Sequence, residues 1–276
     1  MSERAADTDT GPGEGHGDPW WSPRSVACGQ TLEARLGTLV LKLAHHEGEW
    51  ALATEQLDED SAGPRAEFTL HDHHADAVVA ERFIVTGGDT VELVPMLADR
   101  PVVIRPRSPV SLLPGSQTTM YLSTPVTLRI QVRGTPPLVL REVPMLRLSD
   151  TWFGPSTREG ELCYAGRTHA RHALEELPRR VHRVITAVRI VNHAPSALAL
   201  ERISLPVPVL SVFGASDSRL WTQAVSLQRS SDTDMAALRI DDKPPAEAGA
   251  VEPLSGPRQQ PERGGVVRAF SLLFRE

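Results

Sequence analysis

At 276 residues and 40% hydrophobic content, the chain can bury a core in one large domain or in two of ordinary size. The formal net charge of −6 argues against a protein built mainly to hold nucleic acid, because phosphate contacts need an excess of basic residues. The sequence has no apolar run of about 18 residues, and residues 1–19 lack the regions of a secretory signal, so we expect a cytoplasmic protein that does not span a membrane. Cys28 and Cys163 are too few for a disulfide framework.

The chain starts with an acidic, glycine-rich segment, and we expect residues 1–22 to be a disordered tail. Trp20 and Trp21 begin the folded part, where we expect them to anchor the chain on a sheet. A hairpin is predicted next, closed by residues 45–48. The strands predicted in this part are 36–44, 49–54, 67–70, 78–85 and 91–97. For residues 78–85 the alternative is a helix over 75–82.

The central stretch, residues 100–133, carries the clearest strand pattern. Apolar Val126, Leu128, Ile130 and Val132 alternate with polar residues, so one face of a strand should be buried and the other exposed. A shorter extended run, 118–122, comes before it, after a turn at Pro114-Gly115.

The chain after residue 133 shows the same pattern of short strands separated by turns. Residues 241–265 are rich in Pro, Gly, Ala and Glu and predict a mobile excursion, whereas the apolar segment 266–274 should pair in a sheet. The pattern predicts an all-β fold with little helix, an antiparallel β-sandwich divided into parts 23–160 and 161–276, which are either two layers or two domains. The further predicted strands are 138–142, 145–148, 160–164, 184–192, 197–205, 209–213, 220–227 and 235–240.

Histidine gathers in one segment beside aspartate. His71, His73, His74 and Asp76 are the residue types that hold zinc or iron. Adjacent histidines seldom point to one centre, and no matching second ligand set is found, so a polar, solvated loop is the competing interpretation. The metal interpretation would make the protein a metal-dependent hydrolase centred on this segment.

A basic and aromatic region follows the middle of the chain. On a strand over 163–174, Arg167, His169 and Arg171 fall on one face, where they could hold an anionic ligand. Trp152 and Tyr164 flank a Gly-Pro turn and could add a recognition surface. A solvated basic face and aromatics that close the end of a core are the alternatives.

Motifs for covalent catalysis are missing from the sequence. Ser216 lacks the second glycine of a nucleophile elbow, Ser116 precedes a strand rather than a helix, and Cys163 falls within a predicted strand. The sequence indicates no catalytic residue and no cofactor, and it favours binding over catalysis.

Several short motifs together resemble one family. They are LPGS at 113–116, Tyr121 and Pro125, WFG at 152–154, GELCY at 160–164, VRIVN at 188–192 and ERISLP at 201–206. In order and spacing they resemble the prokaryotic domain-of-unknown-function family numbered four hundred and thirty-two. The resemblance covers residues 30–276 and brings no activity or site residue. A loose association of its members with mechanosensitive-channel genes implies an accessory role beside a membrane channel.

We therefore expect a bacterial binding or regulatory module whose partner is another protein. The alternatives are the hydrolase and a binder of a small anionic ligand or carbohydrate. Nucleic acid is not an expected partner, and the sequence does not indicate an oligomeric state.

Overall fold

The computed structural model describes residues 18–72, 81–85, 87–260 and 265–270. Within these ranges the chain forms short strands and has no α-helix, so the prediction of an all-β fold with little helix is confirmed. The described helical pieces are single 3-10 turns: η1 (Glu59–Ser61), η2 (Leu174–Glu176), η3 (Val207–Val209) and η4 (Ala246–Ala248).

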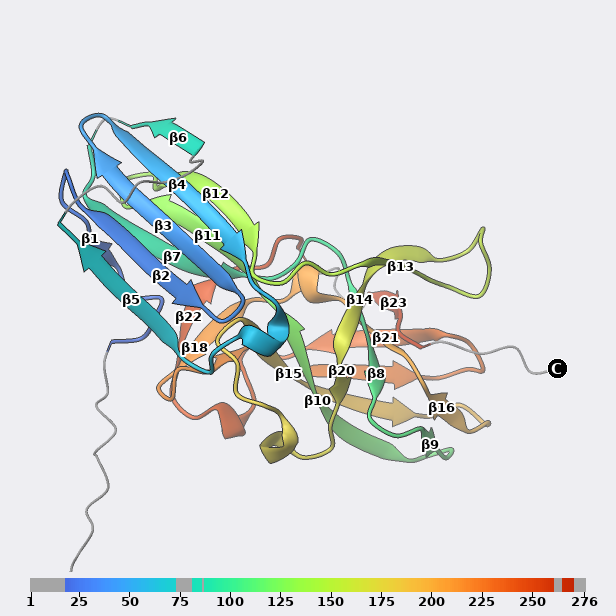
Figure 1. Cartoon of the computed structure of the whole chain (residues 1–276). Coiled ribbons are helices and arrows are strands. Elements are labelled where there is room, and N and C mark those ends of the chain that lie inside the picture. Colours follow the sequence, from blue (N-terminus) through green and yellow to red (C-terminus); the bar gives the residue numbers. More distant parts are fainter. Residues whose placement is uncertain (1–17, 73–80, 86, 261–264, 271–276) are drawn as a thin grey trace, which may run out of the picture.

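The upper left half in Figure 1 contains a five-stranded sheet. Tight turns make its central hairpins, because Gly37 and Gly48 adopt φ values of +62° and +75° that a two-residue turn requires. This confirms the predicted hairpin closed by residues 45–48. The strand order is β5 (Ala66–His71), β2 (Thr31–Leu36), β3 (Leu39–His46), β4 (Glu49–Gln56) and β6 (Glu81–Ile84).

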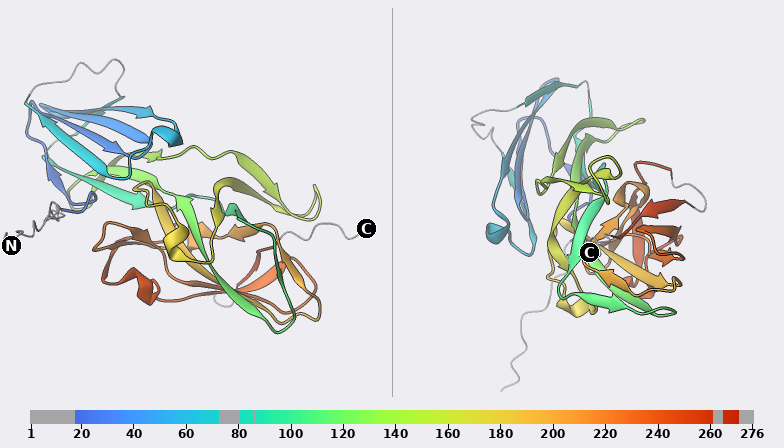
Figure 2. Two further views of the ribbon diagram at one scale, coloured as in Figure 1. Left: turned by 60° about the horizontal axis from the view of Figure 1, so that its bottom comes forward. Right: turned by 90° about the vertical axis from the view of Figure 1, so that its right-hand side faces the viewer.

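A four-stranded sheet lies beneath it, visible as a separate layer in Figure 2. Val126 and the alternating residues Leu128, Ile130 and Val132 are at most 2% exposed and share one buried cluster with Leu41 of the facing sheet. The predicted inward face of this strand is therefore confirmed. The order is β1 (Arg24–Ser25), β7 (Thr90–Met96), β11 (Thr127–Val132) and β12 (Leu138–Pro144).

The lower right half in Figure 1 is built around β15 (Arg183–Asn192). Every residue of β10 (Gln117–Pro125) pairs with β15. The other strands of this eight-stranded sheet are β22 (Val251–Ser255), β18 (Val212–Ala215), β19 (Leu220–Trp221), β20 (Val225–Arg229), β21 (Met235–Ile240) and β23 (Val266–Arg268).

A second four-stranded sheet covers this half and carries the site described below. Its order is β13 (Asp150–Phe153), β14 (Glu161–Ala170), β8 (Val102–Pro106) and β17 (Ile203–Leu205), and a separate pair joins β16 (Leu198–Leu200) to β9 (Val110–Leu112).

Strand pairing crosses residue 160, where the sequence suggested a division. β8 and β10 come before this residue, yet they pair with β14 and β15 after it. The division into parts 23–160 and 161–276 stays a prediction about folding units, and the sheets do not follow it. The predicted mobile segment 241–265 contains a paired strand in its described part, because β22 pairs with β18 and Ser255 Oγ donates a hydrogen bond of 2.6 Å to Pro95 O.

An ionic cluster joins the two halves. Glu59 of η1 accepts hydrogen bonds of 2.5 and 3.0 Å from Arg183, whose side chain is 2% exposed at the start of β15. His182 beside it is fully buried, with Nε2 3.6 Å from the same carboxylate oxygen. Burial acts to raise the pKa of Glu59, but hydrogen bonding and charge from Arg183 outweigh it and hold that pKa below its ordinary value.

Candidate functional site

The candidate site lies where two parallel strands end. β8 and β14 run in the same direction, so the residues that follow both strands meet at one edge of the sheet. The pairing extends past the end of β8, since Arg107 N donates a hydrogen bond of 3.1 Å to Ala170 O. A cavity of about 440 Å³ opens at this edge, lined by Pro106, Arg107, Ser108, Ala170, Arg171, His172 and Glu176.

Two guanidinium groups in this cavity share one carboxylate at long distance. Glu176 Oε2 lies 3.8 Å from Arg107 Nη1 and 3.9 Å from Arg171 Nε, both beyond hydrogen-bond distance. Among the described residues, the buried Nε and Nη1 of Arg171 have no hydrogen-bond partner. His172 Nδ1 lies 3.4 Å from Thr118 Oγ1, and the imidazole ring adds a further polar group to the lining. The cavity therefore offers donors and an excess of positive charge to an anion.

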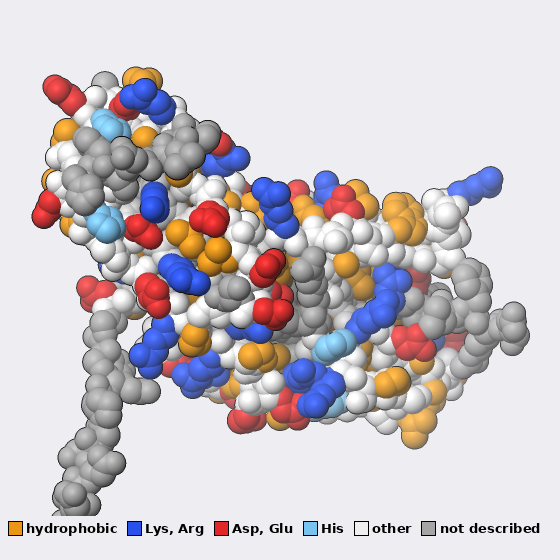
Figure 3. All heavy atoms as spheres, in the orientation of Figure 1, with side chains coloured by type: hydrophobic (Ala, Val, Ile, Leu, Met, Phe, Trp, Pro, Cys, Tyr) orange, Lys and Arg blue, Asp and Glu red, His pale blue; other side chains and the backbone are white. Residues whose placement is uncertain are grey.

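Basic side chains also gather on the surface around this cavity. Figure 3 shows blue side chains, the colour of Arg and Lys, with histidine beside them, over the region of β8 and β14 in the lower right half. Arg105, Arg107, His169 and His172 are all exposed here. This concentration contrasts with the net charge of −6 for the whole chain.

The structure brings together only part of the predicted ligand site. Arg171 lines the cavity and His169 is exposed beside Arg105, whereas the side chain of Arg167 lies outside the description. Tyr164 is paired with Val102, three residues before Arg105, so it projects from the opposite face of the sheet.

Trp152 also lies on the face opposite His169, because it pairs with Leu162, two residues before Tyr164 on the same strand. Its indole Nε1 donates a hydrogen bond of 2.7 Å to Ser156 O, and Tyr164 Oη donates one of 2.9 Å to Asp99 Oδ1. The two aromatic residues therefore do not line the basic cavity.

Sequence reasoning missed Arg107, Ser108 and Glu176 as site residues. The signal was the closeness of Arg105 and Arg107 in the sequence, on either side of Pro106, where β8 ends. Nothing in that spacing reveals the partner strand, because β14 lies about sixty residues further on and pairs in parallel.

The predicted metal cluster is described only at His71. His73, His74 and Asp76 lie outside the described residues, while His71 Nε2 is 3.5 Å from Glu33 Oε2. Within the described ranges no group of three His, Cys, Asp or Glu side chains could hold a metal ion. The metal site and the hydrolase centred on it stay predictions.

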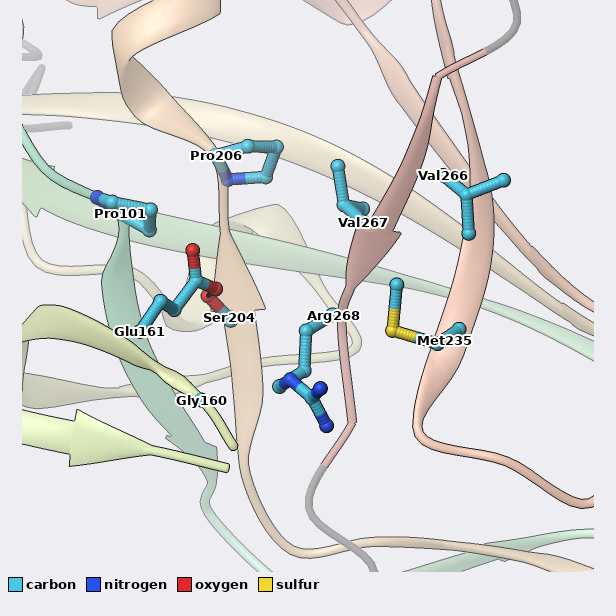
Figure 4. Close-up of a pocket in the computed structure, with 9 residues that line it drawn as sticks. All are labelled: Pro101, Gly160, Glu161, Ser204, Pro206, Met235, Val266, Val267 and Arg268. Atoms are coloured by element: carbon cyan, nitrogen blue, oxygen red, sulfur yellow. Dashed lines mark hydrogen bonds between the residues drawn. The ribbon is translucent and has the colours of Figure 1, made fainter. Parts of the chain in front are cut away.

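A second cavity of about 300 Å³ lies between β14, β17 and β23 (Figure 4). Ser204 Oγ donates to Glu161 Oε1 over 3.5 Å, and burial raises the pKa of this carboxyl group. The guanidinium of Arg268 turns away from Glu161 in Figure 4 and pairs with Asp234. The described lining holds no histidine or lysine, and Glu161 is the carboxylate in it that contacts Ser204.

Cys163 lies next to this cavity on β14, within the strand predicted over 160–164, and is fully buried. Burial, followed by the charge of Glu161, raises the pKa of its thiol to about 11. The thiol stays protonated near neutral pH, which is the state of a packing residue rather than a nucleophile.

The fold and site define an all-β protein with a basic cavity at the ends of two parallel strands. A family model covers nearly the whole chain: residues 20–275 match the family described as "Protein of unknown function (DUF432)". The chain belongs to that family, which confirms the resemblance seen in its motifs. No curated protein and no solved structure matches the chain. No helix in the described ranges is long and apolar enough to cross a membrane.

Proposed function

We propose that this protein is a binding protein whose cavity at the ends of β8 and β14 holds an anionic group of a small ligand. The observation that carries the proposal is Arg171, whose buried Nε and Nη1 have no hydrogen-bond partner among the described residues. Leaving a buried donor unpaired costs about 1–3 kcal/mol, and more for a charged group. A phosphate or carboxylate group that reaches this guanidinium would recover that free energy.

The cavity has the size and chemistry for such a ligand. Its volume of about 440 Å³ falls within the range typical of small-molecule sites, roughly 300–1,000 Å³. Arg107 and Arg171 provide forked donors, Ser108 provides a hydroxyl group, and Pro106 and Ala170 provide an apolar wall. Glu176 occupies the position between the arginines and would compete with the ligand.

Other predicted roles have less support at the level of residues. A binding module for a protein partner stays a prediction, as do the cytoplasmic location and the bacterial source. The accessory role beside a membrane channel stays an implication of the family resemblance, since no described residue points to such a partner.

The direct test is a calorimetric titration of the whole chain with inorganic phosphate at constant ionic strength. We expect saturable binding that Arg171→Gln abolishes. Arg239→Gln is the matched control, because Arg239 also has one ion pair of 3.8 Å, to Asp241, and lines neither cavity. Equal phosphate binding by wild type and Arg171→Gln would refute the proposal, and so would the absence of binding at millimolar phosphate.

A further inference from the structure

A row of arginine and histidine side chains crosses three strands next to the cavity. In the parallel register His169 of β14 lies opposite Arg105 of β8. On the other side of β8, Ile203 pairs with Ile104 in antiparallel register, which places Arg202, one residue before β17, beside Arg105. His169, Arg105 and Arg202 therefore project from the same face of the sheet, which we call the basic row.

The basic row continues into the cavity. Arg107 comes directly after the last residue of β8, two residues beyond Arg105, so the Cα atoms of the two arginines are at most about 7 Å apart. Neighbouring strands are about 4.8 Å apart, which sets the spacing between His169, Arg105 and Arg202. One ligand of modest size can therefore contact both the cavity and the basic row.

The described residues provide no counter-charge for this row. Arg105 has no ion pair among them, and Arg202 donates only a long hydrogen bond of 3.4 Å, to Trp152 O, with its guanidinium 5.2 Å from the Phe153 ring centre. Burial first, and then the charge of Arg105, lowers the pKa of Arg202. Elsewhere in the fold arginines such as Arg129 and Arg183 have carboxylate partners within 3 Å. Adjacent, uncompensated arginines are unfavourable, and an anion between them relieves this repulsion.

We infer that the ligand is a polyanion, a small molecule with two or more phosphate groups. This inference rests on the proposed function. One anionic group occupies the cavity between Arg107 and Arg171, and a second lies on Arg105, His169 and Arg202. Phosphate suits these donors because a guanidinium binds it in a bidentate manner.

A small molecule fits this face better than a nucleic acid does. Single-stranded nucleic acid binds by stacking its bases on exposed aromatic rings as well as by charge. Here Trp152 and Tyr164 project from the opposite face, and Phe153 is 1% exposed. The site therefore offers charge without a stacking platform.

The test compares inorganic phosphate with tripolyphosphate by calorimetry at constant ionic strength. We expect tripolyphosphate to bind at least about ten-fold more tightly than phosphate, equivalent to about 1.4 kcal/mol. The Arg105→Gln/His169→Gln double variant should lose most of this advantage and keep its affinity for phosphate. Both side chains are exposed, so this variant should fold, which its melting temperature checks. Arg202→Gln is the second variant, and Arg239→Gln is again the control.

The outcomes separate this inference from the proposed function. Phosphate binding with no gain for tripolyphosphate, or with a gain that both variants retain, overturns the polyanion inference and leaves the cavity as an anion site. Failure of both ligands to bind overturns both proposals. A single-stranded oligonucleotide that binds more tightly than tripolyphosphate, through the same arginines, overturns the choice of a small molecule.

Discussion

At the scale of single residues, Arg171 and Arg183 differ in whether their guanidinium groups have close hydrogen-bond acceptors. Arg183 is almost completely buried and donates two hydrogen bonds to Glu59 and one of 3.3 Å to Ser123 O. Arg171 has a 19% exposed side chain, and its nearest carboxylate oxygen is 3.9 Å from Nε. The first arginine has carboxylate and carbonyl partners, whereas the second has donor atoms, Nε and Nη1, with no hydrogen-bond partner among the described residues.

This contrast predicts different effects on stability without ligand. Arg171→Gln should keep or raise the free energy of unfolding, by about 1 kcal/mol, because it removes a charged group whose buried Nε and Nη1 have no hydrogen-bond partner among the described residues. Arg183→Gln should cost about 3–5 kcal/mol, because it leaves Glu59 without its main partner. Urea unfolding followed by tryptophan fluorescence measures both values. A loss in Arg171→Gln as large as that in Arg183→Gln would show that Arg171 is structural.

At the scale of elements, the 3-10 turn η2 places Glu176 between the two cavity arginines. Glu176→Gln should strengthen phosphate binding about two- to five-fold, because a half-exposed carboxylate in such an ion pair is worth roughly 0.2–1 kcal/mol. Calorimetry measures the change, and Glu175→Gln in the same turn is the control. Weaker phosphate binding in Glu176→Gln would mean that the carboxylate helps to hold the ligand.

Strand β11 makes a second prediction at this scale. Leu128 is 0% exposed, so Leu128→Ala should reduce the free energy of unfolding by roughly 2–5 kcal/mol. Leu138 on the neighbouring β12 is 45% exposed, and Leu138→Ala should cost much less. Equal losses in chemical denaturation would contradict the assignment of the buried face.

Local patterns predicted the strands that alternate or pair with near neighbours. Val126 to Val132 gave a clear period of two, and residues 45–48 marked the turn between β3 and β4. The predicted strand 36–44 was wrong at residues 37–38, which form the turn between β2 and β3. β8 was not predicted as a strand, because it is short, ends in a proline and is buried at Val102, Val103 and Ile104 without alternation. Its parallel pairing with β14 is a long-range contact that no local pattern encodes, so the cavity could not be assembled from the sequence.

At the scale of the whole molecule, two contacts between residues far apart in the sequence join the two halves. Trp20 and Trp21 are buried, as predicted, and Trp21 Nε1 donates a hydrogen bond of 2.6 Å to Glu252 Oε1 of β22. η1, from the loop after β4, reaches Arg183 of β15 through Glu59. The boundary suggested near residue 160 came from turn signals, which mark changes of direction but not which sheet a strand joins.

The junction predicts a specific dependence of stability on pH. Burial, with the nearby charge of Arg183, lowers the pKa of His182 from 6.5 to about 4, against the opposing effect of Glu59. As pH falls from 6.5 to 4, the unfolded chain takes up a proton at this residue and the folded chain does not, so stability is lost in that window. The full loss is roughly 3 kcal/mol, and no loss from this residue occurs above pH 6.5.

Urea unfolding across this pH range checks the prediction. His182→Gln should remove most of the slope between pH 6.5 and pH 4 and keep the separate loss from Glu59 at lower pH. His193→Gln, outside the junction, is the control. An unchanged slope in His182→Gln would contradict the buried, neutral state of this histidine.

The central claim is that Arg171 donates to an anion, and NMR of the arginine Nε–Hε groups tests it most directly. The Arg171 signal is identified by its absence from the spectrum of Arg171→Gln. We expect phosphate to move this signal in a saturable manner and to slow its exchange with water, while the Arg239 signal stays in place. An Arg171 signal that does not respond while phosphate moves other arginine signals would contradict the account.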